Sequence, residues 1–222
     1  MMRYLYHLSR LNHTRMKYLL VVFAMFMNTF MQAQQVAEKG SWILGIGSEA
    51  GIYSNEVTTN VFGFEETYTD TAGAFFFPLS VEYCVLNRLS VGTQLRLGKY
   101  VDDEDYEDNN TGVWNFSVAY HFLKKERNDL YARIAFGPAN LRIENNRSDA
   151  TGEWRGGHFG VGLGYRHYFG KTVGVHLYVQ NGAYTLRQES LSVGNLIIDP
   201  DLARWDMVLR GPELGFGLNV KF

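Results

Sequence analysis

The chain has 222 residues, a formal net charge of −2 and a single cysteine, Cys84. The near-neutral charge argues against a general nucleic-acid binder, and a lone cysteine excludes an intrachain disulfide. Aromatic residues make up 15% of the chain, which also has 23 glycines but only 4 prolines. This mixture favours strands and tight turns over helices.

Residues 1–33 have the features of a leader that is removed on export. Met16-Lys17 precedes a short apolar run from Tyr18 to Met27, and a small-residue boundary follows at Ala33. This order is typical of a signal peptide, and the run is shorter than the about 20 apolar residues of a membrane-spanning helix. No cysteine follows Ala33, so the boundary is not that of a lipid-anchored protein.

The remaining residues, 34–222, are enough for one domain and too few for two. We therefore predict a leader and signal peptide over 1–33 and a single domain over 34–222. Translation starts either at Met1 or at Met16, and the pattern leaves both open.

Eight segments of the predicted domain alternate large apolar residues with small or polar ones, the period of a β-strand. In the clearest of them, Trp114, Phe116 and Val118 alternate with Asn115 and Ser117. The eight segments are 42–53, 75–85, 91–98, 114–122, 131–137, 158–168, 173–180 and 213–222.

The chemistry of the two faces indicates a membrane barrel. The second face carries glycines, isolated charges and small polar residues, which would make a poor solvent surface but fit a narrow barrel interior. The apolar face would then contact lipid, and every backbone polar group is satisfied only if the sheet closes. We predict an all-β fold, an eight-stranded antiparallel transmembrane up-and-down barrel preceded by a cleavable signal peptide.

The connections between the predicted strands alternate in length, as long external loops and short periplasmic turns do in outer-membrane barrels. The long polar connections are 54–73, 101–112, 144–153 and 186–206, and the short ones are 86–90, 123–128 and 170–172. Aromatic residues near strand ends predict two interfacial girdles: Trp114, Trp154, Tyr53 and Phe75 toward the long connections, and Trp42, Tyr83, Phe122, Phe169 and Phe222 toward the short ones.

The last strand carries a resemblance to a known family. Gly215, Leu218, Val220 and Phe222 follow the pattern of a glycine, alternating apolar residues and a final aromatic. With the leader and eight strands, this resembles the small outer-membrane β-barrel proteins of Gram-negative bacteria, the OmpA and OmpX type of the porin family. Val220 departs from the aromatic often found there. The resemblance implies recognition of Phe222 by the barrel-assembly machinery, contact with lipid and lipopolysaccharide, a monomeric state and location in the cell outer membrane.

The alternation along the strands places a network of polar side chains inside the predicted barrel. Its members are Glu49, Glu82, Arg96, Arg133, His158, Arg166, His176 and Glu213, joined by His121 and Lys221. If Val85 faces Val91, Glu82 lies within reach of Arg96. Such a network either forms a gated ion path or plugs and stiffens the barrel, and the narrow interior of eight strands favours the plug.

Catalysis is not predicted. His167 has lipid-facing phase but lies at the periplasmic end, and His158 points inward without a Ser-His-Asp or Cys-His spacing. We expect no catalytic residue and no cofactor.

An acidic run, 102–108, is a weak candidate for a divalent cation site. Its carboxylates Asp102, Asp103, Asp105 and Asp108 are oxygen ligands of the kind that calcium and magnesium prefer. The run lacks the glycine and closing glutamate of an EF-hand loop, so a solvated loop is the favoured interpretation. The sharper hypothesis is that cations bridge it to lipopolysaccharide phosphates.

Three functions remain open from the sequence. The first is a non-enzymatic integral outer-membrane barrel whose external loops, 54–73 and 186–206 above all, stabilise the envelope or contact surface partners. The second is a narrow passive pore, and the third is a soluble secreted barrel of the lipocalin kind that binds an apolar ligand. No loop residue is nominated as a binding site.

Overall fold

A computed structural model describes residues 38–101, 107–124, 127–145 and 147–222 of the chain. The predicted leader, 1–33, lies outside the described residues, and its removal stays a prediction. The strands are β1 (Trp42–Val61), β2 (Phe64–Leu86), β3 (Leu89–Val101), β4 (Glu107–Lys124), β5 (Asn128–Asn145), β6 (Ala150–Tyr168), β7 (Val173–Val193), β8 (Leu196–Ile198) and β9 (Ala203–Lys221). No helix among the described residues has the length and hydropathy needed to cross a membrane.

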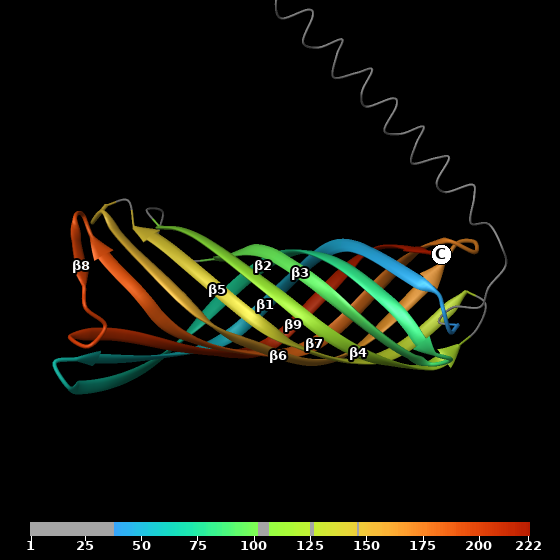
Figure 1. The fold of residues 1–222 in the computed structure, drawn as a ribbon, viewed down its shortest axis with the longest axis horizontal. Coiled ribbons are helices and arrows are strands. Elements are labelled where there is room, and N and C mark those ends of the chain that lie inside the picture. Colours follow the sequence, from blue (N-terminus) through green and yellow to red (C-terminus); the bar gives the residue numbers. More distant parts are fainter. Residues whose placement is uncertain (1–37, 102–106, 125–126, 146) are drawn as a thin grey trace, which may run out of the picture. The chain divides into compact units, whose positions relative to one another are not determined.

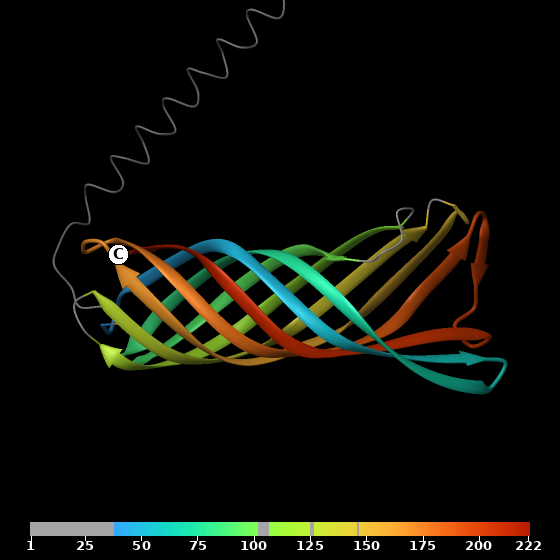
Figure 2. The same ribbon diagram turned by 180° about the vertical axis from the view of Figure 1, so that it is seen from behind.

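Eight of the strands close into an antiparallel barrel, as Figures 1 and 2 show. Neighbours in the chain pair in order from β1 to β7, and β9 pairs both with β7 and with β1. The short β8 pairs only with the end of β7, outside the ring. Backbone groups of Trp42 and Phe222 exchange hydrogen bonds of 3.1 and 2.9 Å, which complete the seam. The predicted fold class is confirmed.

The apolar side chains lie on the outside of the barrel. Along β4, Trp114, Phe116, Val118, Tyr120 and Phe122 are 43–55% exposed, whereas the alternate residues Asn115, Ala119 and His121 are buried. The same outer belt runs around the other strands of the ring. A soluble lipocalin-like barrel would instead bury this set and expose polar side chains, so the arrangement is that of a barrel surrounded by lipid.

The long polar connections predicted from the sequence are mostly strand, which corrects the loop assignment. Pairing of β1 with β2 continues to Val61 and Phe64, and that of β6 with β7 continues to Ala150 and Val193. Phe62 and Gly63 form the two-residue turn of the first hairpin with φ values of 51° and 82°, the pattern of a type I′ turn. Beyond the lipid-facing belt, the outer face of these strands does not contact lipid and needs no apolar side chains. Their sequences are therefore polar and resembled loops.

Two residues of the predicted interfacial girdles point into the barrel instead of toward lipid. Tyr53 is fully buried and Trp154 is 8% exposed, and both belong to an apolar cluster inside the barrel near the extended end. Tyr53 shares the phase of Glu49, so the inward-facing period continues past the apparent strand end. Trp42, Phe75, Trp114, Phe122 and Phe169 are exposed on the outside, as expected.

Candidate functional site

All eight residues of the predicted lumen network lie on the inner face. The glycines between them supply the room, because a side chain there would collide with a neighbour. A Cβ added to Gly182 would lie 2.4 Å from Oε1 of Glu213, and one added to Gly164 would lie 2.3 Å from the Tyr131 hydroxyl. The network falls into two ionic clusters, centred on Arg96 and on Arg166.

The Arg96 cluster holds one cation between two carboxylates. The guanidinium forms ion pairs with Glu49 and with Glu213, the latter at 3.0 Å, and all three side chains are fully buried. The hydroxyls of Tyr53 and Tyr184 donate to Oε1 of Glu213 at 2.7 and 2.8 Å. Buried charges are tolerated when they are paired and hydrogen-bonded in this way.

Aromatic and amide groups enclose the Arg96 cluster. The guanidinium carbon lies 4.4 Å from the centre of the Phe76 ring, a cation–π geometry. His158 lies beside it, with Nε2 at 3.3 Å from Nη1 of Arg96 and Nδ1 at 2.8 Å from Oδ1 of Asn115. The cluster therefore joins side chains from both halves of the ring.

The Arg166 cluster lies toward the short-turn end. Arg166 pairs with Glu82, and its Nη1 lies 3.2 Å from Oδ2 of Asp129. The His121 ring is placed between these same carboxylates: Nδ1 is 2.8 Å from Asp129 and Nε2 is 3.3 Å from Glu82. The Tyr131 ring lies 4.2 Å from the guanidinium carbon.

The sequence predicted the wrong partner for Glu82. The residue opposite Val91 is Tyr83 and not Val85, so Glu82 faces Gly92. Its carboxylate reaches across the lumen to Arg166, while Arg96 pairs with Glu49 and Glu213. A bulge between Cys84 and Leu86 sets this register, and alternation alone does not reveal a bulge.

The space between the two clusters is filled by further polar groups. Arg133 donates to Oε1 of Gln180 at 2.7 Å, and the amide of Gln180 donates to Glu213. His176 contacts Oδ1 of Asn219 at 2.8 Å. The interior cavity lined by Glu82, Arg133, Arg166 and His176, among others, has a volume of only about 20 Å³, space for about one water molecule.

Three residues of the Arg166 cluster have the geometry of a hydrolytic triad that the sequence did not indicate. Ser90 Oγ lies 3.0 Å from Nε2 of His121, and Nδ1 lies 2.8 Å from Asp129. All three are fully buried. Glu82 also faces Nε2, at 3.3 Å, and it shares Arg166 with Asp129, so the three residues are built into the Arg166 cluster. The arrangement therefore supports a structural ion network.

Ser90 and Asp129 were missed because each lies at an end of its strand. Asp129 shares the inward phase of Tyr131 and Arg133, but the predicted strand began only at residue 131, and Ser90 fell in the predicted short connection 86–90. The inward tyrosines, Tyr53, Tyr131, Tyr178 and Tyr184, are equally part of the network. Continuing the alternation by one further pair of residues would have found Ser90 and Asp129, whereas Tyr53, Tyr131 and Tyr178 already lie within the predicted segments.

Most of the predicted acidic cation site cannot be placed. Asp102, Asp103 and Asp105 lie outside the described residues. Asp108 is exposed and forms an ion pair with Lys99. The hydrogen bond from that ammonium lowers the pKa of Asp108 below its usual value.

Two larger hollows lie on the outer face of the barrel, not in the lumen. Their volumes are about 520 and 510 Å³, and both are lined mainly by apolar side chains of β1 to β5. Val81 and Thr93 contribute to both, and Trp114 Nε1 donates to Oγ1 of Thr93 at 2.6 Å. Because these hollows open on the lipid-facing belt, they offer no polar path through the barrel.

No family model and no curated protein matches the chain. Among solved structures, the outer membrane protein OprG from Pseudomonas aeruginosa has a TM-score of 0.62 at 11% identity, over 83% of this chain and 97% of that chain. The outer membrane protein AlkL, whose structure was determined in DMPC lipid bilayers, has a TM-score of 0.53 at 15% identity, over 87% and 95% of the two chains. The fold is thus that of the small outer-membrane barrels, and the resemblance stated from the sequence is confirmed.

Proposed function

We propose that this integral barrel of the outer-membrane type is a closed, non-enzymatic envelope protein whose strand extensions contact partners at the cell surface. The observation that carries the proposal is the filled lumen. Arg96, Glu49 and Glu213 are fully buried across its centre, and an eight-stranded barrel is only just wide enough for its own side chains.

Apolar side chains also close the lumen on the side of the Arg96 cluster that faces away from the Arg166 cluster. This apolar cluster contains Leu141, Leu186, Met207 and Leu209, each at most 8% exposed. A hydrated ion would have to cross this layer and both ionic clusters. The packing therefore favours the plug over the passive pore.

The extensions beyond the belt supply the surface for contact. The β1–β2 hairpin carries Phe62 and Phe64, which are 74% and 80% exposed, and the β7–β8 hairpin carries Leu196 and Ile197, which are 67% and 79% exposed. Figure 1 shows these hairpins at the same end of the barrel. Large exposed apolar residues at paired tips are typical of interaction sites, and contact with lipopolysaccharide or a surface protein is the role we propose.

Conductance measurements distinguish the plug from the pore. The folded protein in planar bilayers should give no steady channel openings, because no continuous aqueous path crosses the Arg96 cluster. Replacement of the Arg96 cluster alone by small residues, Glu49→Ala with Arg96→Ala and Glu213→Ala, should leave the barrel silent, because the apolar layer and the Arg166 cluster still close the lumen. Steady conductance by the unaltered barrel would reject the closed-barrel proposal in favour of the passive pore.

The surface role is tested in cells that lack the protein. Uptake of an apolar dye should rise, and the unaltered chain should restore the barrier, whereas the variant Phe62→Ser with Phe64→Ser and Ile197→Ser should not. Glu65→Gln with Glu66→Gln, on the same hairpin, is the matched control and should restore it. Full restoration by the triple variant would contradict a role for the tips.

A further inference from the structure

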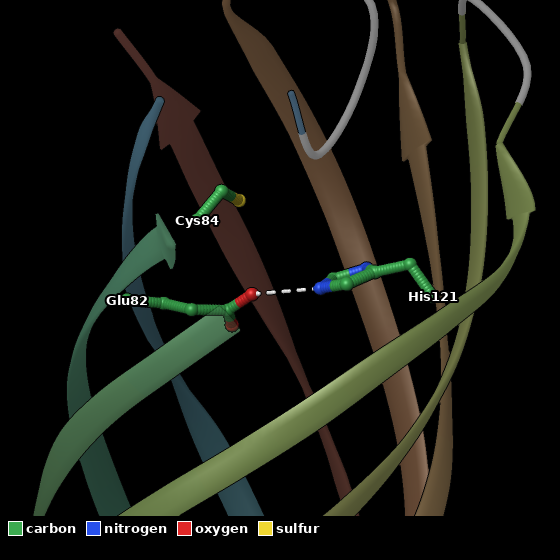
Figure 3. Close-up of side chains that lie close together, drawn as sticks. All are labelled: Glu82, Cys84 and His121. Atoms are coloured by element: carbon green, nitrogen blue, oxygen red, sulfur yellow. Dashed lines mark ion pairs between the residues drawn. The ribbon is translucent and has the colours of Figure 1, made fainter. Parts of the chain in front are cut away.

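The short-turn end of the lumen brings together three different metal-binding side chains. Glu82 and Cys84 lie on β2 and His121 lies on β4, and their ligand atoms are all within 4.8 Å of one another. Figure 3 shows the three side chains, with the carboxylate of Glu82 directed at the imidazole of His121. No other trio of this kind occurs in the described part of the chain.

We propose that Glu82, Cys84 and His121 form a binding site for one zinc ion. Thiolate, imidazole and carboxylate are the three protein ligands that zinc takes. Zinc ligands in a tetrahedral site lie about 3.3 to 3.8 Å from each other, as follows from bond lengths of about 2.0 to 2.3 Å. Oε1 of Glu82 and Nε2 of His121 already have this separation, at 3.3 Å, and the Cys84 thiol has to rotate closer.

The surroundings of His121 match those of a metal-bound histidine. Its other nitrogen, Nδ1, lies 2.8 Å from the buried carboxylate of Asp129. A carboxylate in that position fixes the ring and leaves Nε2 directed at the metal. The Ser90 hydroxyl, 3.0 Å from Nε2, must turn aside when the ion binds.

The charge of the cluster suits a divalent cation. Oε1 of Glu82 lies 3.3 Å from Nε2 of His121 and also accepts from Nη1 of Arg166 at 3.1 Å. With zinc bound and Cys84 as thiolate, the negative charges of Glu82, Asp129 and Cys84 balance those of the ion and Arg166. The buried cluster thus remains neutral, as a low-dielectric interior requires.

The three candidate ligands differ in burial and lie near the rim. The Glu82 side chain is 13% exposed, whereas His121 is fully buried. Cys84 also lies near the rim, because its backbone accepts from Gly40 at 2.8 Å and donates to Ser41 at 2.9 Å beside the start of β1.

Cobalt(II) is the probe, because its absorption reports both thiolate ligation and tetrahedral geometry. The folded full-length barrel in detergent, kept reduced and free of oxygen, should bind one Co²⁺ and develop a thiolate-to-cobalt charge-transfer band. Added Zn²⁺ should remove that band. Cys84→Ser should abolish it, and Asp129→Asn should weaken binding by about 10- to 100-fold.

His176→Gln is the matched control, since this lumen histidine bonds Asn219 and lies outside the cluster; it should bind Co²⁺ as the unaltered protein does. Absence of the charge-transfer band at millimolar Co²⁺, or its persistence in Cys84→Ser, would overturn the site. Folding of each variant is checked by its cold-versus-boiled gel migration.

A second measurement needs no variant. Zn²⁺ should slow the reaction of Cys84 with a small thiol reagent by at least about tenfold, because a bound thiolate is withdrawn from attack. Mg²⁺ at equal concentration should not protect, since it prefers oxygen ligands. An unchanged rate with Zn²⁺ would equally reject the proposal.

Discussion

The Arg96 guanidinium lies 3.0 Å from Oε1 of Glu213, and neither side chain is exposed to solvent. The two residues are far apart in the sequence, on β3 and β9, which are not neighbours in the ring. The pair therefore ties opposite sides of the lumen together, with Glu49 of β1 as the second anion.

Arg96→Met should lower the free energy of unfolding by about 3–5 kcal/mol, because it leaves two buried carboxylates without their cation. The measurement is urea unfolding of the barrel in lipid vesicles. The triple variant Glu49→Gln, Arg96→Met, Glu213→Gln removes all three charges and should lose less stability than Arg96→Met alone. A single variant as stable as the unaltered protein would contradict the description of this cluster.

Leu95→Arg should destabilise the barrel in lipid vesicles by about 2–4 kcal/mol, because it places a charge on the lipid-facing belt. Leu95 is 41% exposed near the middle of β3. Tyr68→Arg is the control, since Tyr68 is 54% exposed on the extension of β2, where water is available. Equal effects of the two substitutions would show that Leu95 does not face hydrocarbon.

Gly137→Ala should cost about 1–3 kcal/mol of unfolding free energy, the usual effect of overpacking. An added Cβ would lie 1.9 Å from the backbone oxygen of Trp114 on the neighbouring strand, and a backbone atom cannot move aside cheaply. Gly157→Ala is the control, because its nearest contact is 3.8 Å away. The urea midpoint of Gly157→Ala should therefore be the higher of the two. A higher midpoint for Gly137→Ala would show that β4 and β5 pair in another register.

Lys99→Met should raise the pKa of Asp108, because the ammonium of Lys99 holds that pKa below its usual value. Since the folded pKa is the lower one, any stabilisation by the pair is present above the unfolded pKa and lost as the pH falls through the folded pKa. Both side chains are more than half exposed, so stability should hardly change. Carboxyl NMR titration of Asp108 measures the shift, and an unmoved pKa would mean that the pair does not persist in solution.

The sequence determined the features that depend on strand period. Alternation along 114–122 and 213–222 predicted which residues face lipid, and the same phase placed Glu49, Arg96 and Glu213 inside, because a strand sends successive side chains to opposite faces. The number of strands in the ring followed from the same segments. The lengths of the strands were underestimated. The hairpin extensions have no lipid-facing side, so apolar and polar residues do not alternate along them.

Only the tertiary structure decided which lumen side chains form ion pairs with each other. The bulge after Cys84 shifts the register of β2 against β3, and closure of the ring brings Glu82 to Arg166 and Arg96 to Glu49 and Glu213. The grouping of Glu82, Cys84 and His121 arises in the same way, from two strands that are not neighbours in the ring. Period is a local property of the chain, whereas these distances are set by curvature and stagger of the whole barrel, which no single strand encodes.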